Sequence, residues 1–297
     1  MSARRPPLSV VIATTKPWPE MRATLDSLLP QARDLGAEVI VADGDGRGLP
    51  DPPALPDVVR IEERGASVFR LRALGRARAR GEVVAITEDH CRVRADWCAA
   101  VVESHRRHPE ADVIGGVVEN GATGSLVDWA QFLVANGPFL PPVRPGAPHR
   151  LPGQANLSYK RRALPPDALG RGVLETFHNQ PLAAGGRLLV DDALVVEHVQ
   201  SVGLRGSCAL NYHNGRSIAG FRLAHMRVAE RLVRLGGVLV LPPYMLARTL
   251  AVVLPKRRHV REVLASLPFL VLFLCCHAAG EAVGYVAGPG ASPARLA

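Results

Sequence analysis

Apolar residues in the first 120 positions follow two periods in turn, which predict strands alternating with helices. Residues 8–13 form a continuous apolar run, typical of a strand covered on both faces, and residues 37–43 predict a second buried strand. Further strands are predicted at residues 58–62, 82–87 and 111–120. Between them, apolar residues return at helical spacing over residues 19–35, 67–80 and 96–108. Strands that alternate with helices imply right-handed crossovers and a parallel sheet. The pattern therefore predicts an α/β fold with a mainly parallel sheet flanked by helices.

Polar side chains stand where three of the predicted strands end. The first strand ends at Thr14, the second at Asp43, and the fourth runs into Glu88, Asp89 and His90. Ligands of such sheets bind at the carboxyl ends of the strands, so we expect a cation and a nucleotide diphosphate to bind here. Because residues i and i+2 of an extended segment point the same way, the two outer members of the triplet share a side, and the middle one turns away unless the strand has already broken. The alternative interpretation of the triplet is a solvated turn with a helix-capping aspartate.

The second half of the chain is less regular and contains no internal repeat. We expect a turn and short strand over residues 153–159 and a helix interrupted by Pro181 over residues 174–185. Residues 187–199 predict two short strands around an Asp-Asp turn, and residues 203–235 predict a long helix or a helix pair.

Two apolar stretches, residues 238–254 and 263–288, dominate the C-terminal end. Neither is an uninterrupted run of about 20 apolar residues, the usual length of a membrane-spanning helix. We expect the first to lie in a membrane interface, with the basic loop at 255–262 on anionic headgroups, and the second to dip into or span the bilayer. Two core helices or an oligomer interface are the alternative. The expected division is a catalytic domain at 1–236 and a membrane-associated helical region at 237–297.

Composition narrows the class of partner. The formal net charge of +9 indicates attraction to anions such as a nucleotide diphosphate or a lipid surface, although a basic chain can also reflect the base composition of its source. Aromatic residues are only 5% and no recognition motif occurs, which argues against nucleic acid. The five cysteines show no ligand or disulfide spacing, in keeping with a reducing cytosol. The first apolar run is too short for a signal peptide, so we expect a cytoplasmic catalytic domain.

Over roughly residues 7–236 the chain resembles the family-two glycosyltransferases of the GT-A fold. The resemblance rests on the order and spacing of segments that individually are not specific. These are "LSVVIATTKPWPEMRATLDSLLPQ", "EVIVADGDG", "RLRALGRARARGEVVAITEDHCRVRADW", "GQANLSYKRRAL" and "LETFHNQPLAAGGRLLVDDALVVEH". In this family they are the opening strand and helix, the nucleotide-binding strand, the arginine helix with the metal motif, the acceptor-side segment and the helix with the catalytic acid.

The resemblance implies a nucleotide-binding set at the sheet edge. Thr14 and Asp43 are implied to contact the base and ribose, and Arg72 to lie near the nucleotide. Glu88 and Asp89 complete this set.

A metal set and a catalytic residue are implied in the same way. Glu88 and His90 occupy the outer positions of the family's Asp-x-Asp motif, and the implied metal ligands are Asp89, His90 and the trailing His198. Glu175 falls at the position of the general base. Since both outer aspartates are replaced, three alternatives remain: an active subgroup with an altered metal site, use of Asp89 as principal ligand, or binding without catalysis. A histidine ligand favours Mn²⁺ over Mg²⁺.

The implied activity is that of an inverting glycosyltransferase. The expected donor is a nucleotide sugar, with UDP favoured, and the acceptor a lipid-linked or envelope glycan at the cytoplasmic face of the inner or plasma membrane. One alternative is an inactive, glycosyltransferase-like protein that binds nucleotide sugars. A nucleotidyltransferase for sugar phosphates is disfavoured, because "ATTKPWPE" after the first strand lacks the expected Gly-rich loop.

Overall fold

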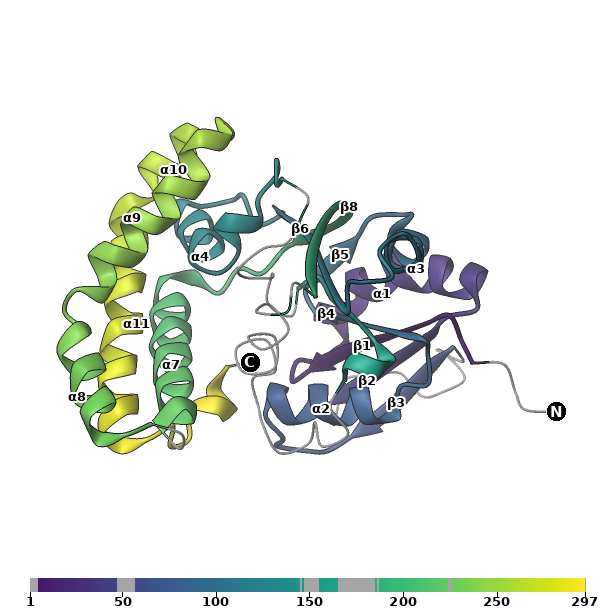
Figure 1. Ribbon diagram of the computed structural model, residues 1–297, viewed down its shortest axis with the longest axis horizontal. Coiled ribbons are helices and arrows are strands. Elements are labelled where there is room, and N and C mark those ends of the chain that lie inside the picture. The colour runs from purple at the N-terminus through teal and green to yellow at the C-terminus, as the bar shows by residue number, and fades with distance from the viewer. Residues whose placement is uncertain are drawn as a thin grey trace. The chain divides into compact units, whose positions relative to one another are not determined.

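The computed structural model describes residues 5–46, 57–144, 146, 155–164, 185, 187–223 and 226–296 (Figure 1). The chain forms two compact units. An α/β unit comprises Met1–Glu119 and Pro141–Val199, and a helical unit comprises Asn120–Leu140 and Gln200–Leu296.

The first half of the α/β unit follows the predicted alternation. Four parallel strands lie in the order β3-β2-β1-β4, namely β1 (Leu8–Thr14), β2 (Glu38–Asp43), β3 (Val58–Glu62) and β4 (Val83–Glu88). Three helices connect or follow them: α1 (Trp18–Leu35), α2 (Val68–Arg78) and α3 (Trp97–Arg107). Every residue of β1 and β2 is buried, in keeping with the apolar residues that make up most of both strands.

Glycines end or adjoin two of these helices for different reasons. Gly36 follows α1 with φ 67°, the left-handed conformation that commonly ends a helix. Gly81 lies two residues beyond the cap of α2 at Ala79 and does not end that helix. Gly81 instead allows close approach to the first strand, because a Cβ there would lie 2.5 Å from the backbone nitrogen of Ser9.

The other half of the sheet contains antiparallel pairs. The eight strands lie in the order β3-β2-β1-β4-β7-β6-β8-β5. Antiparallel pairs join β7 (Leu157–Lys160) to β4 and to β6 (Val113–Asn120), and β5 (Cys91–Val93) to β8 (Leu188–His198). The sheet is therefore mixed, and the predicted parallel arrangement is found in its first four strands.

The prediction of two short strands around an Asp-Asp turn was wrong, because β8 is one strand of 11 residues. Asp191 is buried within it. Its Oδ2 accepts hydrogen bonds from the Ser104 hydroxyl at 2.6 Å and from Arg107 at 2.8 Å. With these donors inside the protein, the carboxylate does not need a turn to reach water. The predicted helix over 174–185 lies outside the described residues, apart from Gly185.

The helical unit contains α4 (Leu126–Asn136), α7 (Gly203–Leu223), α8 (Val228–Gly237), α9 (Leu241–Val253), α10 (Val260–Ala265) and α11 (Leu267–Ala287). The predicted helix pair over 203–235 is present as α7 and α8. Helices α7 and α11 approach closely at glycines, since a Cβ at Gly280 would lie 2.0 Å from the Tyr212 carbonyl oxygen. The expected boundary after residue 236 falls inside this unit, because α7 packs along α11.

Among the described residues, α11 is the helix long and apolar enough to cross a membrane, and half of its apolar window is buried. Helices α8 and α9, the latter continued to Lys256, meet the same criteria only as a pair bent by 70°.

Candidate functional site

The polar residues predicted to meet at the carboxyl edge of the sheet do so. Thr14 and Asp43 are register partners at the ends of β1 and β2, and Ala13 is the partner of Glu88 at the end of β4. The parallel strands thus bring three segments, far apart in the sequence, to one edge.

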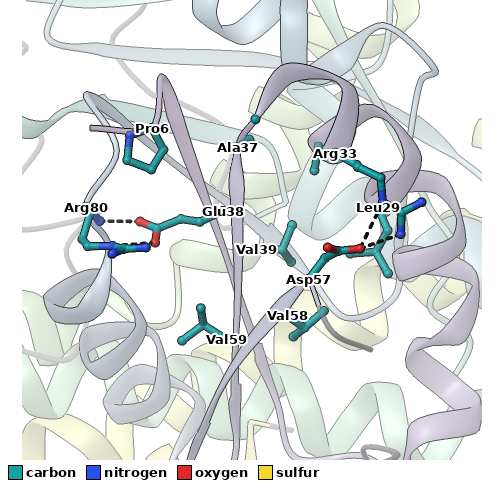
Figure 2. A pocket seen from close by; sticks show the side chains of 12 residues that line it. Pro6, Leu29, Arg33, Ala37, Glu38, Val39, Asp57, Val58, Val59 and Arg80 are labelled. Atoms are coloured by element: carbon teal, nitrogen blue, oxygen red, sulfur yellow. Dashed lines mark hydrogen bonds and ion pairs between the residues drawn. The ribbon is translucent and has the colours of Figure 1, made fainter. Parts of the chain in front are cut away.

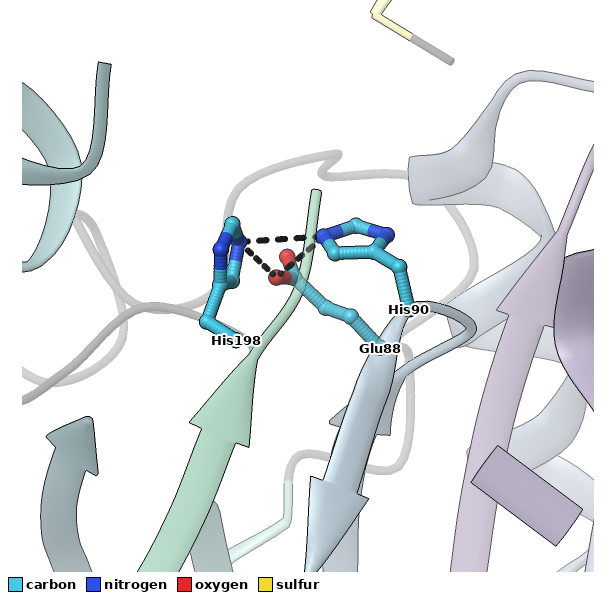
Figure 3. Close-up of side chains that lie close together, drawn as sticks. All are labelled: Glu88, His90 and His198. Carbon is cyan, nitrogen blue, oxygen red and sulfur yellow. Dashed lines mark hydrogen bonds and ion pairs between the residues drawn. The ribbon is translucent and has the colours of Figure 1, made fainter. Parts of the chain in front are cut away.

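His198 reaches this edge from the other half of the sheet. It is the last residue of β8 and pairs with Cys91 at the start of β5, directly after the polar triplet. Its Nε2 lies 3.0 Å from Nε2 of His90, and the two rings meet at 87° (Figure 3). Oε2 of Glu88 lies 3.3 Å from the His90 Nε2 and 3.5 Å from the His198 Nε2.

The three atoms are arranged like the ligands of one metal ion. Nitrogen and oxygen ligands at about 2.1 Å from an ion lie about 3.0–3.4 Å from one another in octahedral or tetrahedral geometry. The observed separations of 3.0, 3.3 and 3.5 Å fall close to that range. Two imidazoles and one carboxylate suit Mn²⁺ and other transition metals better than Mg²⁺, which prefers oxygen. Glu88, His90 and His198 therefore fit a divalent ion.

Asp89 stands apart from this cluster, although the resemblance implied it as a ligand. Its Oδ2 accepts a hydrogen bond from the Thr14 hydroxyl at 2.8 Å, and its Oδ1 lies 2.6 Å from Nδ1 of His90. The Thr24 hydroxyl donates to its backbone carbonyl at 2.8 Å. As the spacing of two predicts, Glu88 and His90 share a side, and Asp89 turns away from it.

Charge in the cluster is divided unevenly between the two imidazoles. Burial disfavours ionisation of Glu88, but hydrogen bonds from His198 and His90 and the charge of Arg72 outweigh it and hold the carboxyl pKa well below its usual range. Burial also opposes the charge on His90, yet its two carboxylate neighbours raise its pKa. The pKa of His198 is lowered, chiefly by burial.

Arg72 enters the site through Glu88. Its Nη2 donates to Oε1 of Glu88 at 3.0 Å, on the carboxylate oxygen that the imidazoles leave free. The buried Nε of Arg72 has no hydrogen-bond partner in the described part of the chain. The guanidinium thus retains a donor for an anion.

Asp43 is fully buried and its carboxylate organises the loop after β2. Oδ1 accepts from the backbone nitrogens of Asp45 and Gly46 at 2.8 and 3.0 Å, and Oδ2 accepts from Arg60 at 3.3 Å. Sequence reasoning missed Arg60, and it missed Lys16, whose Nζ lies 3.9 Å from Asp89. The positions of these two residues could have indicated them. Lys16 follows the end of β1 by two residues, and Arg60 is the register partner of Val41 in β2.

Two further segments of the resemblance have different outcomes. Asn156 of "GQAN" is buried, donates to the carbonyls of Val117 and Leu194 at 2.9 Å, and accepts from Trp97 at 3.0 Å. Asn156 therefore links β6 to β8. Glu175 lies outside the described residues, so its role as general base stays a prediction.

A pocket lies at the opposite edge, where β2 and β3 begin (Figure 2). Its charged walls are paired internally, Glu38 with Arg80 at 3.2 Å and Asp57 with Arg33 at 2.5 Å. Because parallel sheets bind ligands at the carboxyl ends of their strands, we assign the site to the Glu88 edge.

Comparisons with known proteins agree with this architecture. The family model for glycosyl transferase family 2 matches residues 9–151. The glucosyl-dolichyl phosphate glucuronosyltransferase of Haloferax volcanii is 31% identical over 120 residues, which are 37% of this chain and 38% of that relative. This match therefore spans well under half of the relative's length.

One solved structure shows the fold over nearly the whole chain. It is the mannosyltransferase PcManGT from Pyrobaculum calidifontis in complex with GDP-Man and Mn²⁺. The TM-score is 0.56 at 17% identity, covering 96% of this chain and 88% of that one. Residues 9–151 therefore match glycosyl transferase family 2, and the chain has the GT-A fold.

Proposed function

We propose that the protein is an inverting glycosyltransferase that moves a sugar from a UDP-sugar to a lipid-linked acceptor, on the cytoplasmic side of a membrane, in cell envelope synthesis. The observation that carries the proposal is the cluster of Glu88, His90 and His198 at the carboxyl edge of a family-two sheet. The name of the Haloferax relative, a transferase acting on a dolichyl phosphate derivative, supports the class of acceptor.

A divalent ion, Mn²⁺ in preference to Mg²⁺, is the proposed cofactor, with Glu88, His90 and His198 as its ligands. When bound, it supplies positive charge to the departing diphosphate. Arg72 positions Glu88 through their 3.0 Å hydrogen bond, and its Nε, which has no partner among the described residues, is proposed to donate to the same diphosphate. Thr14 and Asp43 are proposed to line the nucleoside pocket beside it.

Glu175 is proposed as the general base. Its carboxylate accepts the proton of an acceptor hydroxyl while that oxygen attacks the anomeric carbon from the face opposite the diphosphate. The new glycosidic bond forms as the bond to diphosphate breaks, so the configuration inverts. A lipid phosphate acceptor is already ionised and needs no such base.

The second candidate function is binding of a nucleotide sugar without transfer. The observation in its favour is the replacement of both outer aspartates of the metal motif by Glu88 and His90. Each retains a ligand atom in the cluster, which favours the active enzyme.

The deciding experiment is a thermal-shift screen of UDP-, GDP- and dTDP-sugars with and without Mn²⁺, followed by transfer assays to polyprenyl phosphates and lipid-linked glycans. A bound ligand raises the apparent melting temperature by mass action. We expect stabilisation by a UDP-sugar only with Mn²⁺, and transfer from the same donor. Stabilisation without turnover on any acceptor supports the binding protein, and stabilisation by GDP-sugars alone overturns the choice of donor.

A further inference from the structure

Exposed apolar side chains are concentrated in one unit. In the described ranges, every large apolar side chain that is exposed belongs to the helical unit, and most belong to α8, α9, α10 and the turn after α8. The most exposed are Leu239 at 87%, Val233 at 75%, Val228 at 72% and Val240 at 65%. A soluble surface rarely carries so many neighbouring apolar residues without a partner.

Helix α8 is amphipathic, but it buries none of its residues. Val228, Leu232, Leu235 and Leu239 follow the spacing i, i+4, i+7 and i+11, which places them on one face. One flank of this face carries Arg231, which donates to the Val286 carbonyl at 2.9 Å, and the ion pair of Arg234 with Glu230 at 3.1 Å. The helix therefore turns this flank toward α11 and leaves its apolar face uncovered.

Charge indicates what covers this face. The helical unit contains twelve arginine and lysine residues against four aspartate and glutamate residues, a net +8 of the +9 of the whole chain. An exposed apolar face in a strongly basic unit matches an anionic bilayer, whose headgroups attract the cations while its acyl boundary receives the apolar side chains.

Helix α11, although long enough to span, is built into the protein. Its His277 and Glu281 are buried, with His277 Nε2 lying 3.4 Å from Oε1 of Glu281. Arg222 of α7 lies 3.7 Å from the same oxygen. Helix α11 therefore cannot enter lipid by itself, because Arg222 of α7, which lies beside Glu281, would have to enter the lipid with it.

We propose that the helical unit binds one face of an anionic bilayer through the apolar face of α8 and the turn at Leu239 and Val240, with α11 remaining packed against α7. The binding is peripheral and does not span. This deepens the proposed function by bringing the site to lipid-linked acceptors, but the binding itself does not depend on catalysis.

The test is flotation of the full chain with vesicles of phosphatidylcholine, alone or with about 30% phosphatidylglycerol. We expect flotation with the anionic vesicles, release at about 1 M salt, and at least tenfold weaker binding by the double variant Val228→Asp/Leu232→Asp. Leu126→Asp, at an exposed position of α4 in the same unit, is the matched control and should bind normally.

Three outcomes overturn the proposal. Equal binding to neutral vesicles that resists salt shows an inserted helix. No flotation together with self-association in solution shows that the face joins copies of the chain. Normal binding by the double variant removes α8 from the interface. UDP and Mn²⁺ binding measured on the same variants separates these outcomes from failure of the proposed function, since the variants leave the edge cluster intact.

Discussion

Asp89 holds the ring of His90 by its Nδ1 atom, at 2.6 Å from Oδ1, and so directs Nε2 of that ring toward Glu88 and His198. Asp89 is itself fixed by the Thr14 hydroxyl of β1. A carboxylate that receives the second ring N–H of a metal-binding histidine sets its tautomer and orientation. We therefore propose that Asp89, which the resemblance implied as a ligand, instead supports the ligand His90.

From this geometry we predict that Asp89→Asn weakens Mn²⁺ binding by about 10–100-fold, because an amide is a poorer acceptor for the imidazole N–H. Calorimetry or Mn²⁺ electron paramagnetic resonance measures the affinity. Asp192→Asn, on an exposed position of β8, is the matched control. Complete loss of Mn²⁺ binding in a folded Asp89→Asn protein would instead identify Asp89 as a direct ligand.

Removal of one imidazole should abolish the metal site. We expect His198→Ala to bind no Mn²⁺ at concentrations that saturate the wild type, because only two of the three clustered ligands remain. His108→Gln, away from the cluster, should bind normally. After chelation of the wild type, Mn²⁺ should restore transfer at least as well as Mg²⁺. Restoration by Mg²⁺ and not by Mn²⁺ would argue against imidazole ligands.

The effect of Glu175→Gln depends on the acceptor. With a hydroxyl acceptor we predict a loss of transfer rate on the order of 100-fold or more, because the attacking oxygen keeps its proton. With an ionised lipid phosphate the variant should keep most of its rate. Initial rates with both acceptors and the same donor make this comparison, and equal large losses with both would assign Glu175 to binding rather than to proton transfer.

Buried His105 should make folding sensitive to acid. Burial lowers its pKa to about 3 from an ordinary 6.5, and its Nε2 lies 2.9 Å from the Ser158 hydroxyl. Between pH 6.5 and 3 the unfolded chain binds a proton at this imidazole, whereas the folded protein does not. The free energy of unfolding therefore decreases as the pH falls through this range. The loss is at most about 1.4 kcal/mol per pH unit. Denaturant unfolding at pH 7.5 and 5.0 should show a smaller decrease for His105→Gln than for the wild type, and equal decreases would contradict the assignment.

Contact between α7 and α11 should tolerate no side chain at Gly280. Gly280→Ala places a Cβ against the Tyr212 carbonyl, and we expect the free energy of unfolding to fall by about 1–3 kcal/mol. Gly236→Ala in α8, where nothing lies within 4 Å of the new Cβ, should leave stability unchanged or raise it by about 0.5 kcal/mol. Thermal unfolding of the two variants compares them directly, and equal melting temperatures would show that the helices separate without cost.

The parallel strands, the helices between them and the meeting of Thr14, Asp43 and the 88–90 triplet could all be predicted from the sequence. Local patterns suffice for these, because a strand buried on both faces must be apolar throughout and its carboxyl end must emerge at one edge. The antiparallel strands could not be predicted in the same way. From the sequence alone, Asp191 is predicted to lie in a turn. In the folded protein its hydrogen bonds come from Ser104 and Arg107, which are distant in the chain.

At the site, the spacing of two residues by itself determined that Glu88 and His90 share a side of the chain. Which carboxylate joins His198 was decided only by the tertiary structure. The pairing of β5 with β8 brings His198 beside Glu88, and the Thr14 hydroxyl draws Asp89 the other way. Likewise, the sequence marked residues 238–254 and 263–288 as apolar. Only packing showed that α11 in the second stretch is half buried, and that α8, before the first stretch, leaves apolar side chains uncovered. Burial depends on which neighbours a helix meets, and those neighbours come from distant parts of the chain.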